Sequence, residues 1–546
     1  MSAEAESVHL PLTAGQELHW LGLSRNPDWL TGVWRLQKIS GNLDPDTLVS
    51  GINDTVKLHT ALRVGVSARR GEPQQFVREC PPASRLVTAK NIRSDSLKQF
   101  DRYVERLWCT EIVRPWDLVQ DYPFRFFLLR HSSAYHVLLA GFSHLAVDGT
   151  ACNLILSDIW EKYGGSRDAR PDDGRYIAAV ANHPGRRAGG SVAAERHWAN
   201  RAAAIPPAVQ FRGEDEQTRP DTEPAAAYRP LRLDGESLAA MRQAVAAADC
   251  SEFQWILAVF AASIFSVSLL DRVKLSVVVD MRGSAERDIS GMFAVRVPLI
   301  IDRQSAPELF LPHVRSQLLQ SIKACRRAGP LEAHMALERK TGELGRPLVD
   351  DLSINYVRAE RTSADRRSAG IDITETSAPE GARFETAGLD FQVLSRPDSL
   401  TYSFIANEKV MPTSVQGQFL AAFRAALPTG AAAVPDAPAP AGAASGKRLS
   451  RLTDPQGQTV FVVDTRELAS EIKGVEEVAR VDVDVCKHEG TMDVLRARVV
   501  ARGDLSAEAL CSHLGRVAQG SRFLTVPQSM AIEREEWMNC PRDSHD

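Results

Sequence analysis

The residues best suited to chemistry lie in the segment Ser143-His144-Leu145-Ala146-Val147-Asp148-Gly149. The apolar run from Tyr135 to Phe142 predicts a buried strand before it, and apolar residues between Cys152 and Tyr163 recur at helical spacing after it. The pattern therefore predicts a strand that ends at a histidine, a turn at the Asp-Gly pair, and a helix. A base in this position lies near a helix N-terminus, where developing negative charge is stabilised. A buried histidine that only satisfies the core is the alternative.

Length and composition exclude several function classes. With 546 residues, we expect two or three domains. The 65 basic and 69 acidic residues give a net charge of −4, which produces no general attraction to nucleic acid or to a membrane surface. The eight cysteines include no CxxC pair, which favours free thiols in a reducing cytosol. No apolar run is long enough to span a membrane, and residues 1–8 do not resemble a signal peptide, so we expect a cytoplasmic protein.

Composition and periodicity divide the chain into four parts. Two mixed α/β lobes are expected at residues 1–185 and 186–428. An Ala/Pro-rich linker is expected at 429–447, because such a tract buries no core. A small α/β domain is expected at 448–546.

Further motifs surround the histidine segment in a fixed order, and together they resemble the condensation domains of nonribosomal peptide synthetases over about residues 8–428. The motifs are Thr13-Ala-Gly-Gln16-Glu-Leu-His-Trp20, Leu58-His59-Thr-Ala-Leu62-Arg63, Ser143 to Gly149, Tyr176 to Val180, Gly291 to Leu299 with Asp280-Met-Arg282 before it, and Leu352 to Tyr356. The resemblance implies an α/β (α+β) fold, a pseudodimer of two chloramphenicol-acetyltransferase-like lobes with a central tunnel.

The implied reaction is acyl transfer from a carrier-protein thioester, with His144 at the middle of the tunnel. His144 then acts as a general base or orients the nucleophile, and the residues leave both roles open. The backbone N–H of Gly149 is the candidate donor to the oxyanion. No metal and no permanently bound cofactor are expected. The donor is a phosphopantetheine thioester on a partner carrier protein.

Asp148 is expected to be structural, because the equivalent carboxylate of the family pairs with an arginine. Arg282 is the first candidate for that partner, and Arg63 is the second. A simple N-cap role for Asp148 is an equal alternative. Ser143 replaces the first histidine of the family motif and is expected to shape the loop. Asn355 is expected either to contact the acceptor substrate or to be a buried strand residue.

The order of strands and helices after residue 448 resembles the small lid subdomain of adenylate-forming enzymes. Pro527 is followed by no lysine, and the chain contains no phosphate-binding loop, so we expect no use of ATP. An unrelated small α/β module is the alternative.

The sequence thus predicts a condensation-type acyltransferase of specialised metabolism, forming an amide or an ester. Its partners would be a carrier protein in trans and a small amine or alcohol, without nucleic acid or membrane. An acyl-CoA-dependent acyltransferase and a non-catalytic docking protein are the alternatives.

Overall fold

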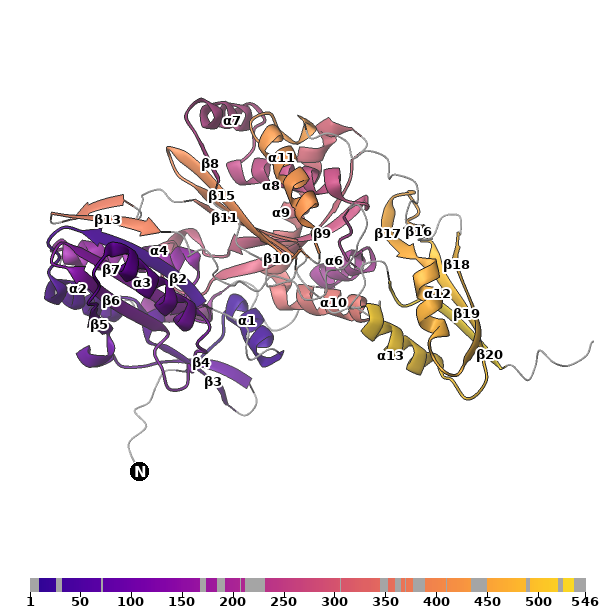
Figure 1. Cartoon of the computed structure of the whole chain (residues 1–546), viewed down its shortest axis with the longest axis horizontal. Coiled ribbons are helices and arrows are strands. Elements are labelled where there is room, and N and C mark those ends of the chain that lie inside the picture. Colours follow the sequence, from indigo (N-terminus) through magenta and orange to yellow (C-terminus); the bar gives the residue numbers. More distant parts are fainter. Residues whose placement is uncertain are drawn as a thin grey trace, which may run out of the picture.

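The computed structural model describes most of the chain, from His9 to Arg534 (Figure 1). The described residues are 9–25, 32–69, 72–166, 173–183, 192–206, 208–211, 231–304, 306–343, 352–358, 365–368, 370–376, 388–408, 410–433, 449–487, 492–518 and 524–534.

The first lobe is built on a six-stranded mixed sheet. Its strand order is β12 (Asp365–Ser368), β13 (Ile371–Thr376), β2 (Gly32–Ser40), β7 (Tyr135–Ser143), β6 (Phe124–Ser132) and β5 (Val87–Asn91). Helices α2 (Pro45–Leu58) and α4 (Gly149–Tyr163) cover one face, and α3 (Leu97–Ile112) covers the other. Both faces of β7 are therefore buried, which explains why its sequence is a continuous apolar run. The predicted β6–β7 hairpin is confirmed.

The second lobe repeats the plan with another six-stranded sheet. Its strand order is β10 (Ala294–Asp302), β9 (Arg272–Asp280), β11 (Leu352–Arg358), β14 (Leu389–Ser395), β15 (Ser399–Ala406) and β8 (Leu231–Asp234). Its helices are α6 (Val192–Ala203), α7 (Gly235–Ala247), α8 (Glu252–Val267), α9 (Phe310–Ala328), α10 (Pro330–Glu343) and α11 (Thr413–Ala426).

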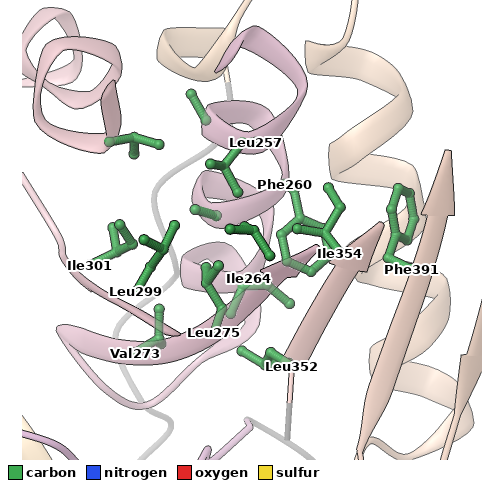
Figure 2. Close-up of a cluster of buried hydrophobic side chains, with 14 of the residues drawn as sticks. Leu257, Phe260, Ile264, Val273, Leu275, Leu299, Ile301, Leu352, Ile354 and Phe391 are labelled. Atoms are coloured by element: carbon green, nitrogen blue, oxygen red, sulfur yellow. The ribbon is translucent and has the colours of Figure 1, made fainter. Parts of the chain in front are cut away.

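The core of the second lobe lies on one face of its sheet. Figure 2 shows Leu257, Phe260 and Ile264 of α8 pointing toward apolar side chains of β9, β10, β11 and β14. Because side chains alternate along a strand, the polar residues of these strands lie on the opposite face. That face carries Arg296 of β10 and Asn355 of β11.

The predicted boundary at residue 185 lies outside the described residues, and one segment after it does not belong to the second lobe. Strand β13 belongs to the predicted second lobe, yet it pairs with β2 of the first lobe, with Ile373 opposite Ile39. Ile371 and Ile373 are buried in the core of the first lobe. The assignment of all of 186–428 to one lobe is therefore wrong for residues 365–368 and 371–376. A strand pattern reveals which side chains are buried but not which sheet buries them.

A third small sheet and two helices connect the lobes near the N-terminus. The sheet has the order β1 (His9–Pro11), β4 (Glu72–Val77) and β3 (Val64–Arg69), and the helices are α1 (Ala14–Arg25) and α5 (Asp173–Ala181). Their apolar cluster includes Tyr176 and Val180 as well as Ile289 and Phe293 of the second lobe.

The predicted linker begins later than residue 429. Gly430 lies over the Trp255 ring, where an added Cβ would be 2.8 Å from a ring carbon, and the Trp255 indole donates a hydrogen bond to the Leu427 carbonyl. Residues 431–433 form a short 3-10 helix against α8. The rest of the linker, 434–447, lies outside the described residues.

The C-terminal domain has the predicted mixture of short strands and helices. Its elements are β16 (Leu449–Thr453), β17 (Thr459–Asp464), α12 (Thr465–Lys473), β18 (Val478–Cys486), β19 (Val494–Ala501), α13 (Ala507–Ala518) and β20 (Ser529–Arg534). The two-stranded sheet β16–β17 precedes a three-stranded sheet in the order β18, β19, β20.

Buried polar contacts join the C-terminal domain to the second lobe. The side-chain amide of Gln210 donates to the Val462 carbonyl at 2.7 Å and accepts from the Val462 N–H at 2.8 Å. Asp271 makes a similar pair of bonds with the backbone of Thr459. The backbone of β17 is therefore held by side chains and backbone groups of the second lobe.

Among the described residues, no single helix is long and apolar enough to cross a membrane, and the one helix pair that passes this test together, α7 with α8, is bent by 101°.

Candidate active site

The turn between β7 and α4 holds His144, as the sequence predicts. Ser143 ends the strand, and its carbonyl accepts hydrogen bonds from the N–H groups of Ala146 and Val147 at 3.0 Å. The Ser143 hydroxyl accepts a further bond from Leu145 N–H at 3.3 Å. Ser143 is fully buried and shapes the turn, which is the structural position expected for it.

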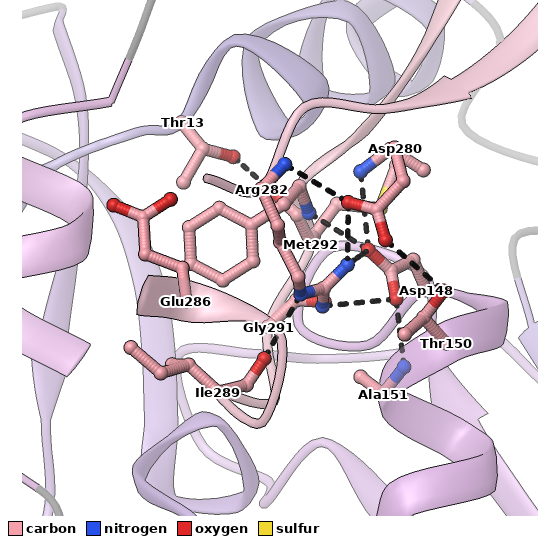
Figure 3. A network of polar contacts seen from close by, with 12 residues as sticks. Thr13, Asp148, Thr150, Ala151, Asp280, Arg282, Glu286, Ile289, Gly291 and Met292 are labelled. Atoms are coloured by element: carbon pink, nitrogen blue, oxygen red, sulfur yellow. Dashed lines mark hydrogen bonds and ion pairs between the residues drawn. The ribbon is translucent and has the colours of Figure 1, made fainter. Parts of the chain in front are cut away.

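Asp148 combines the two roles that the sequence left as alternatives. Its Oδ1 caps helix α4 by accepting from the Ala151 N–H at 2.8 Å. The same carboxylate forms a two-pronged ion pair with Arg282, at 2.8 and 3.1 Å. Figure 3 shows the two groups facing each other above the start of the helix. Because one carboxylate can accept four or more hydrogen bonds, the cap and the ion pair do not compete.

The Asp148–Arg282 pair is almost completely removed from solvent. The side chains of the two residues are 1% and 2% exposed. Asp148 also accepts from the N–H groups of Phe293 and Ala294, at 2.9 and 3.1 Å. A buried carboxylate with every lone pair engaged is stable as an ion, whereas loss of one partner leaves an uncompensated charge.

Arg282 ties the second lobe to the histidine turn. Its guanidinium donates to the carbonyls of Ile289 and Gly291 at 3.0 Å, and it lies over the Phe293 ring. Asp280, two residues before Arg282, binds it at 3.0 Å and accepts from the Thr150 hydroxyl. The loop between β9 and β10 is thereby fixed against the start of α4.

The prediction that Arg63 is an alternative partner of Asp148 is wrong. Its guanidinium donates to the backbone carbonyls of Val56, Lys57 and Arg78 instead. These contacts satisfy carbonyl groups at the C-terminal end of α2 and directly after β4.

His144 is neutral near pH 7. Burial has the largest effect and lowers its pKa to about 4, with the positive charges of Arg296 and Arg35 acting in the same direction. Asp148 and the Val147 backbone act in the opposite direction. Nδ1 is buried and makes no regular hydrogen bond with a described residue, which leaves Nε2 as the candidate nitrogen for a substrate. A neutral imidazole is the form that accepts a proton.

Gly149 is the first residue of α4 and is partly exposed. A Cβ built on it would meet no atom within 4 Å, so the space around it is open. The first N–H groups of a helix have no partner within the helix, and the Asp148 cap serves Ala151 rather than Gly149. The geometry is therefore compatible with the predicted oxyanion donor.

Asn355 lies on β11 of the second lobe. It is half-buried in the middle of β11, opposite Gln392 of β14. Arg296 pairs with Val278 of β9, and the register of β9 with β11, continued by one residue, places Asn355 level with Val278. Asn355 is thus two strands, roughly 10 Å, from Arg296 on the same face of the sheet. This position is compatible with both predictions for Asn355, a contact with the acceptor substrate and a buried strand residue.

Sequence reasoning did not assign roles to three residues that surround His144. Gln16 donates to the Leu145 carbonyl at 2.7 Å, directly after the histidine. The His19 ring stacks on the His144 ring, with centroids 4.8 Å apart. Arg296 acts on both rings through its charge. The i, i+3 spacing of Gln16 and His19 on one helix was the available signal.

Comparison with known proteins places the chain in a family. The Condensation domain family matches residues 33–434. The PKS-NRPS hybrid synthetase psoA of Aspergillus fumigatus is 29% identical over 175 residues, which cover 31% of this chain and 4% of that protein. The chain thus matches only a small part of the length of such curated relatives.

Solved structures show the same fold. The first condensation domain of the CDA synthetase has a TM-score of 0.61 at 19% identity, covering 79% of this chain and 97% of that one. The starter condensation domain of rhizomide synthetase RzmA, a mutant crystallised with C8-CoA, has a TM-score of 0.60 at 17% identity and covers 79% and 96%. With the family matched over most of its length and its fold shared with these structures, the chain belongs to the condensation-domain family.

Proposed function

We propose that this protein is a condensation-type acyltransferase of specialised metabolism. It transfers an acyl or aminoacyl group from a carrier-protein thioester to an amine, forming an amide, or to a hydroxyl, forming an ester. The observation that carries this proposal is the neutral His144, held at the start of α4 by the buried Asp148–Arg282 pair. Membership of the condensation-domain family supports the reaction class.

The proposed reaction needs one base and one oxyanion donor. The nucleophilic nitrogen attacks the thioester carbonyl, and its proton passes to Nε2 of His144. The Gly149 N–H donates to the oxygen that becomes negative in the tetrahedral intermediate. The C–S bond then breaks, and the leaving thiolate takes the proton from the His144 imidazolium. The products are the amide and the free thiol, so no external oxidant, reductant or metal enters the balance.

The donor thioester is proposed to sit on the phosphopantetheine arm of a carrier protein supplied in trans. An acyl-CoA donor is the second candidate, because the rhizomide synthetase domain of similar fold was crystallised with C8-CoA. Both donors present the same pantetheine thioester to the protein. They differ in whether a protein surface accompanies it.

Intact-mass spectrometry tests the proposal. An acyl-loaded carrier protein is incubated with this protein and a library of amines and alcohols, and loss of the acyl group and gain of a product are measured. We expect turnover by the native chain and at least a 100-fold loss in His144→Ala. His197→Ala is the matched control, because His197 is a half-buried histidine of α6 with its own ring contact to Trp198.

The donor is decided in parallel reactions. Equal rates with the free CoA thioester and the carrier-bound one contradict carrier dependence. Absence of turnover with every donor and acceptor, in a chain that still binds the carrier protein, favours the non-catalytic docking function instead.

We further propose that the C-terminal domain is a fixed docking or capping element and does not activate substrates with ATP. Its backbone contacts with Gln210 and Asp271 support a fixed position. ATP-dependent pyrophosphate exchange by the isolated protein, measured with a panel of amino acids and aryl acids, would contradict this part of the proposal.

A further inference from the structure

We propose that His19 is a positioning residue of this acyl-transfer site, whose ring covers one face of the His144 ring and fixes the plane in which Nε2 meets the substrate. This inference rests on the proposed function, because the orientation of Nε2 matters only if His144 takes part in acyl transfer. His19 lies on a different element, α1, and is not part of the His144 segment.

Helix α1 is held against the histidine turn before His19 is reached. The Gln16 amide donates to the carbonyl of Leu145 at 2.7 Å, and its oxygen accepts from the Thr13 N–H at 2.8 Å. The Thr13 hydroxyl donates to the Met292 carbonyl of the second lobe at 2.5 Å. A Cβ on Gly15 would lie 2.4 Å from the Ala294 carbonyl, so the helix approaches β10 as closely as a glycine permits. These contacts leave α1 little freedom to rotate.

His19 lies one helical turn after Gln16 and therefore on the same side of α1. Its ring and the His144 ring are nearly parallel, with an angle of 22° between planes and 4.8 Å between centroids. Parallel rings at this distance block rotation of each other about χ2, the broad torsion that sets the plane of an imidazole. Since Nδ1 of His144 is buried, fixing this plane fixes the direction of Nε2.

The charges around the two rings favour the neutral form of both. Burial lowers the pKa of His19 well below its usual value, and the charges of His144 and Arg296 add to this effect. Around His144, Arg296 of β10 and Arg35 of β2 oppose protonation, and Asp148 at the start of α4 favours it. Two stacked rings next to Arg296 cannot both carry a positive charge at low cost. His144 thus remains available as an acceptor while His19 covers it.

The residue before His144 in the turn is Ser143 and not a second histidine. Here Ser143 is buried in the turn, and a second imidazole reaches the site from α1 instead. The protein therefore has two histidines at the site, contributed by separate elements.

The test compares His19→Ala with His19→Phe. Alanine removes the covering ring and admits water, so the pKa of His144 is expected to rise by about one unit or more toward its ordinary value. Phenylalanine keeps a flat ring, so the pKa of His144 is expected to stay below 5. Both are measured by NMR titration of protein with isotopically labelled histidine between pH 4 and 8, so that a His144 midpoint near 5 or above in His19→Ala is distinguished from a lower one in the native protein and in His19→Phe.

Kinetics give the second readout. In His19→Ala we expect kcat for acyl transfer to fall about 10- to 100-fold with little change in KM, because the base loses orientation while the substrate still binds. His19→Phe is expected to recover most of kcat. His197→Ala controls for the loss of a half-buried histidine and is expected to leave both the His144 titration and kcat unchanged.

An unchanged His144 titration in folded His19→Ala overturns the inference, as does a His19→Phe variant that resembles His19→Ala in both readouts. If the native protein transfers no acyl group but the His144 titration shifts as expected, the proposed function fails while the contact between the two rings stands. The two failures are therefore distinguishable.

Discussion

Asp148 and Arg282 lie 134 positions apart in the chain and meet in a buried, two-pronged ion pair. Asp148 caps the helix after His144, and Arg282 belongs to the β9–β10 loop of the other lobe. The pair therefore connects the two lobes next to the turn that holds His144, on which the proposed chemistry depends. It holds the histidine turn against the β9–β10 loop.

Replacing Arg282 with methionine should strongly destabilise the protein. The Asp148 carboxylate would stay buried without its cation, at a cost of about 3–5 kcal/mol, and the unfolding midpoint in urea measures this loss. The pair of Arg175 and Asp288 is the control, because it has similar bidentate geometry but is 50% and 65% exposed. Arg175→Met should change the midpoint little. Equal effects of the two substitutions would contradict the buried-pair explanation.

Two substitutions of Gly149 distinguish the effect of losing its backbone N–H from the effect of adding a side chain. Gly149→Ala keeps the N–H and adds a methyl group into open space, so activity should be retained. Gly149→Pro removes the N–H at the first helical position, where proline is tolerated. If this N–H stabilises the oxyanion, kcat should fall about 100- to 1,000-fold while circular dichroism and the melting temperature change little. Full activity of a folded proline variant would exclude the N–H as the donor.

The low pKa of His144 predicts a loss of stability in acid. In the unfolded chain a histidine titrates near 6.5, but in the folded protein His144 titrates at about 4. As the pH falls from 6.5 to 4, the unfolded chain binds a proton that the folded protein does not, so the free energy of unfolding decreases.

Urea unfolding at pH 7 and pH 5 measures this effect. The decrease between the two values should be smaller in His144→Gln than in the native protein, because glutamine does not titrate. His9→Gln, at an exposed position of β1, is the control for removing a histidine outside the turn. An equal decrease in the native protein and in His144→Gln would contradict the low pKa.

Gln210→Ala should loosen the C-terminal domain without unfolding it. Loss of both hydrogen bonds to Val462 should raise the hydrogen-exchange rate of the amides in β17, measured by mass spectrometry. Gln416→Ala is the matched control, because the Gln416 amide donates to a backbone carbonyl, that of Met411, within the second lobe. Unchanged exchange in β17 of Gln210→Ala would show that other contacts suffice to hold the domain.

The sequence was sufficient to predict the local structure around the site. The apolar run before His144 and the helical spacing after it predicted β7 and α4, and Asp148 has the residue type of an N-cap. These features depend on contacts within a few residues, which periodicity and capping preferences report directly. The pairing of Asp148 with Arg282 came from the family resemblance, and the structure confirms it.

The tertiary structure alone decided which distant segments meet at the site. No local pattern shows that β13 completes the sheet of the first lobe, that α1 places His19 on His144, or that Gln210 binds the backbone of β17. The sequence by itself determined the elements and the residue types at their ends, since these follow from short-range sterics and burial. Only packing of the whole chain decided their partners, because a buried face records that it is covered and not by which element.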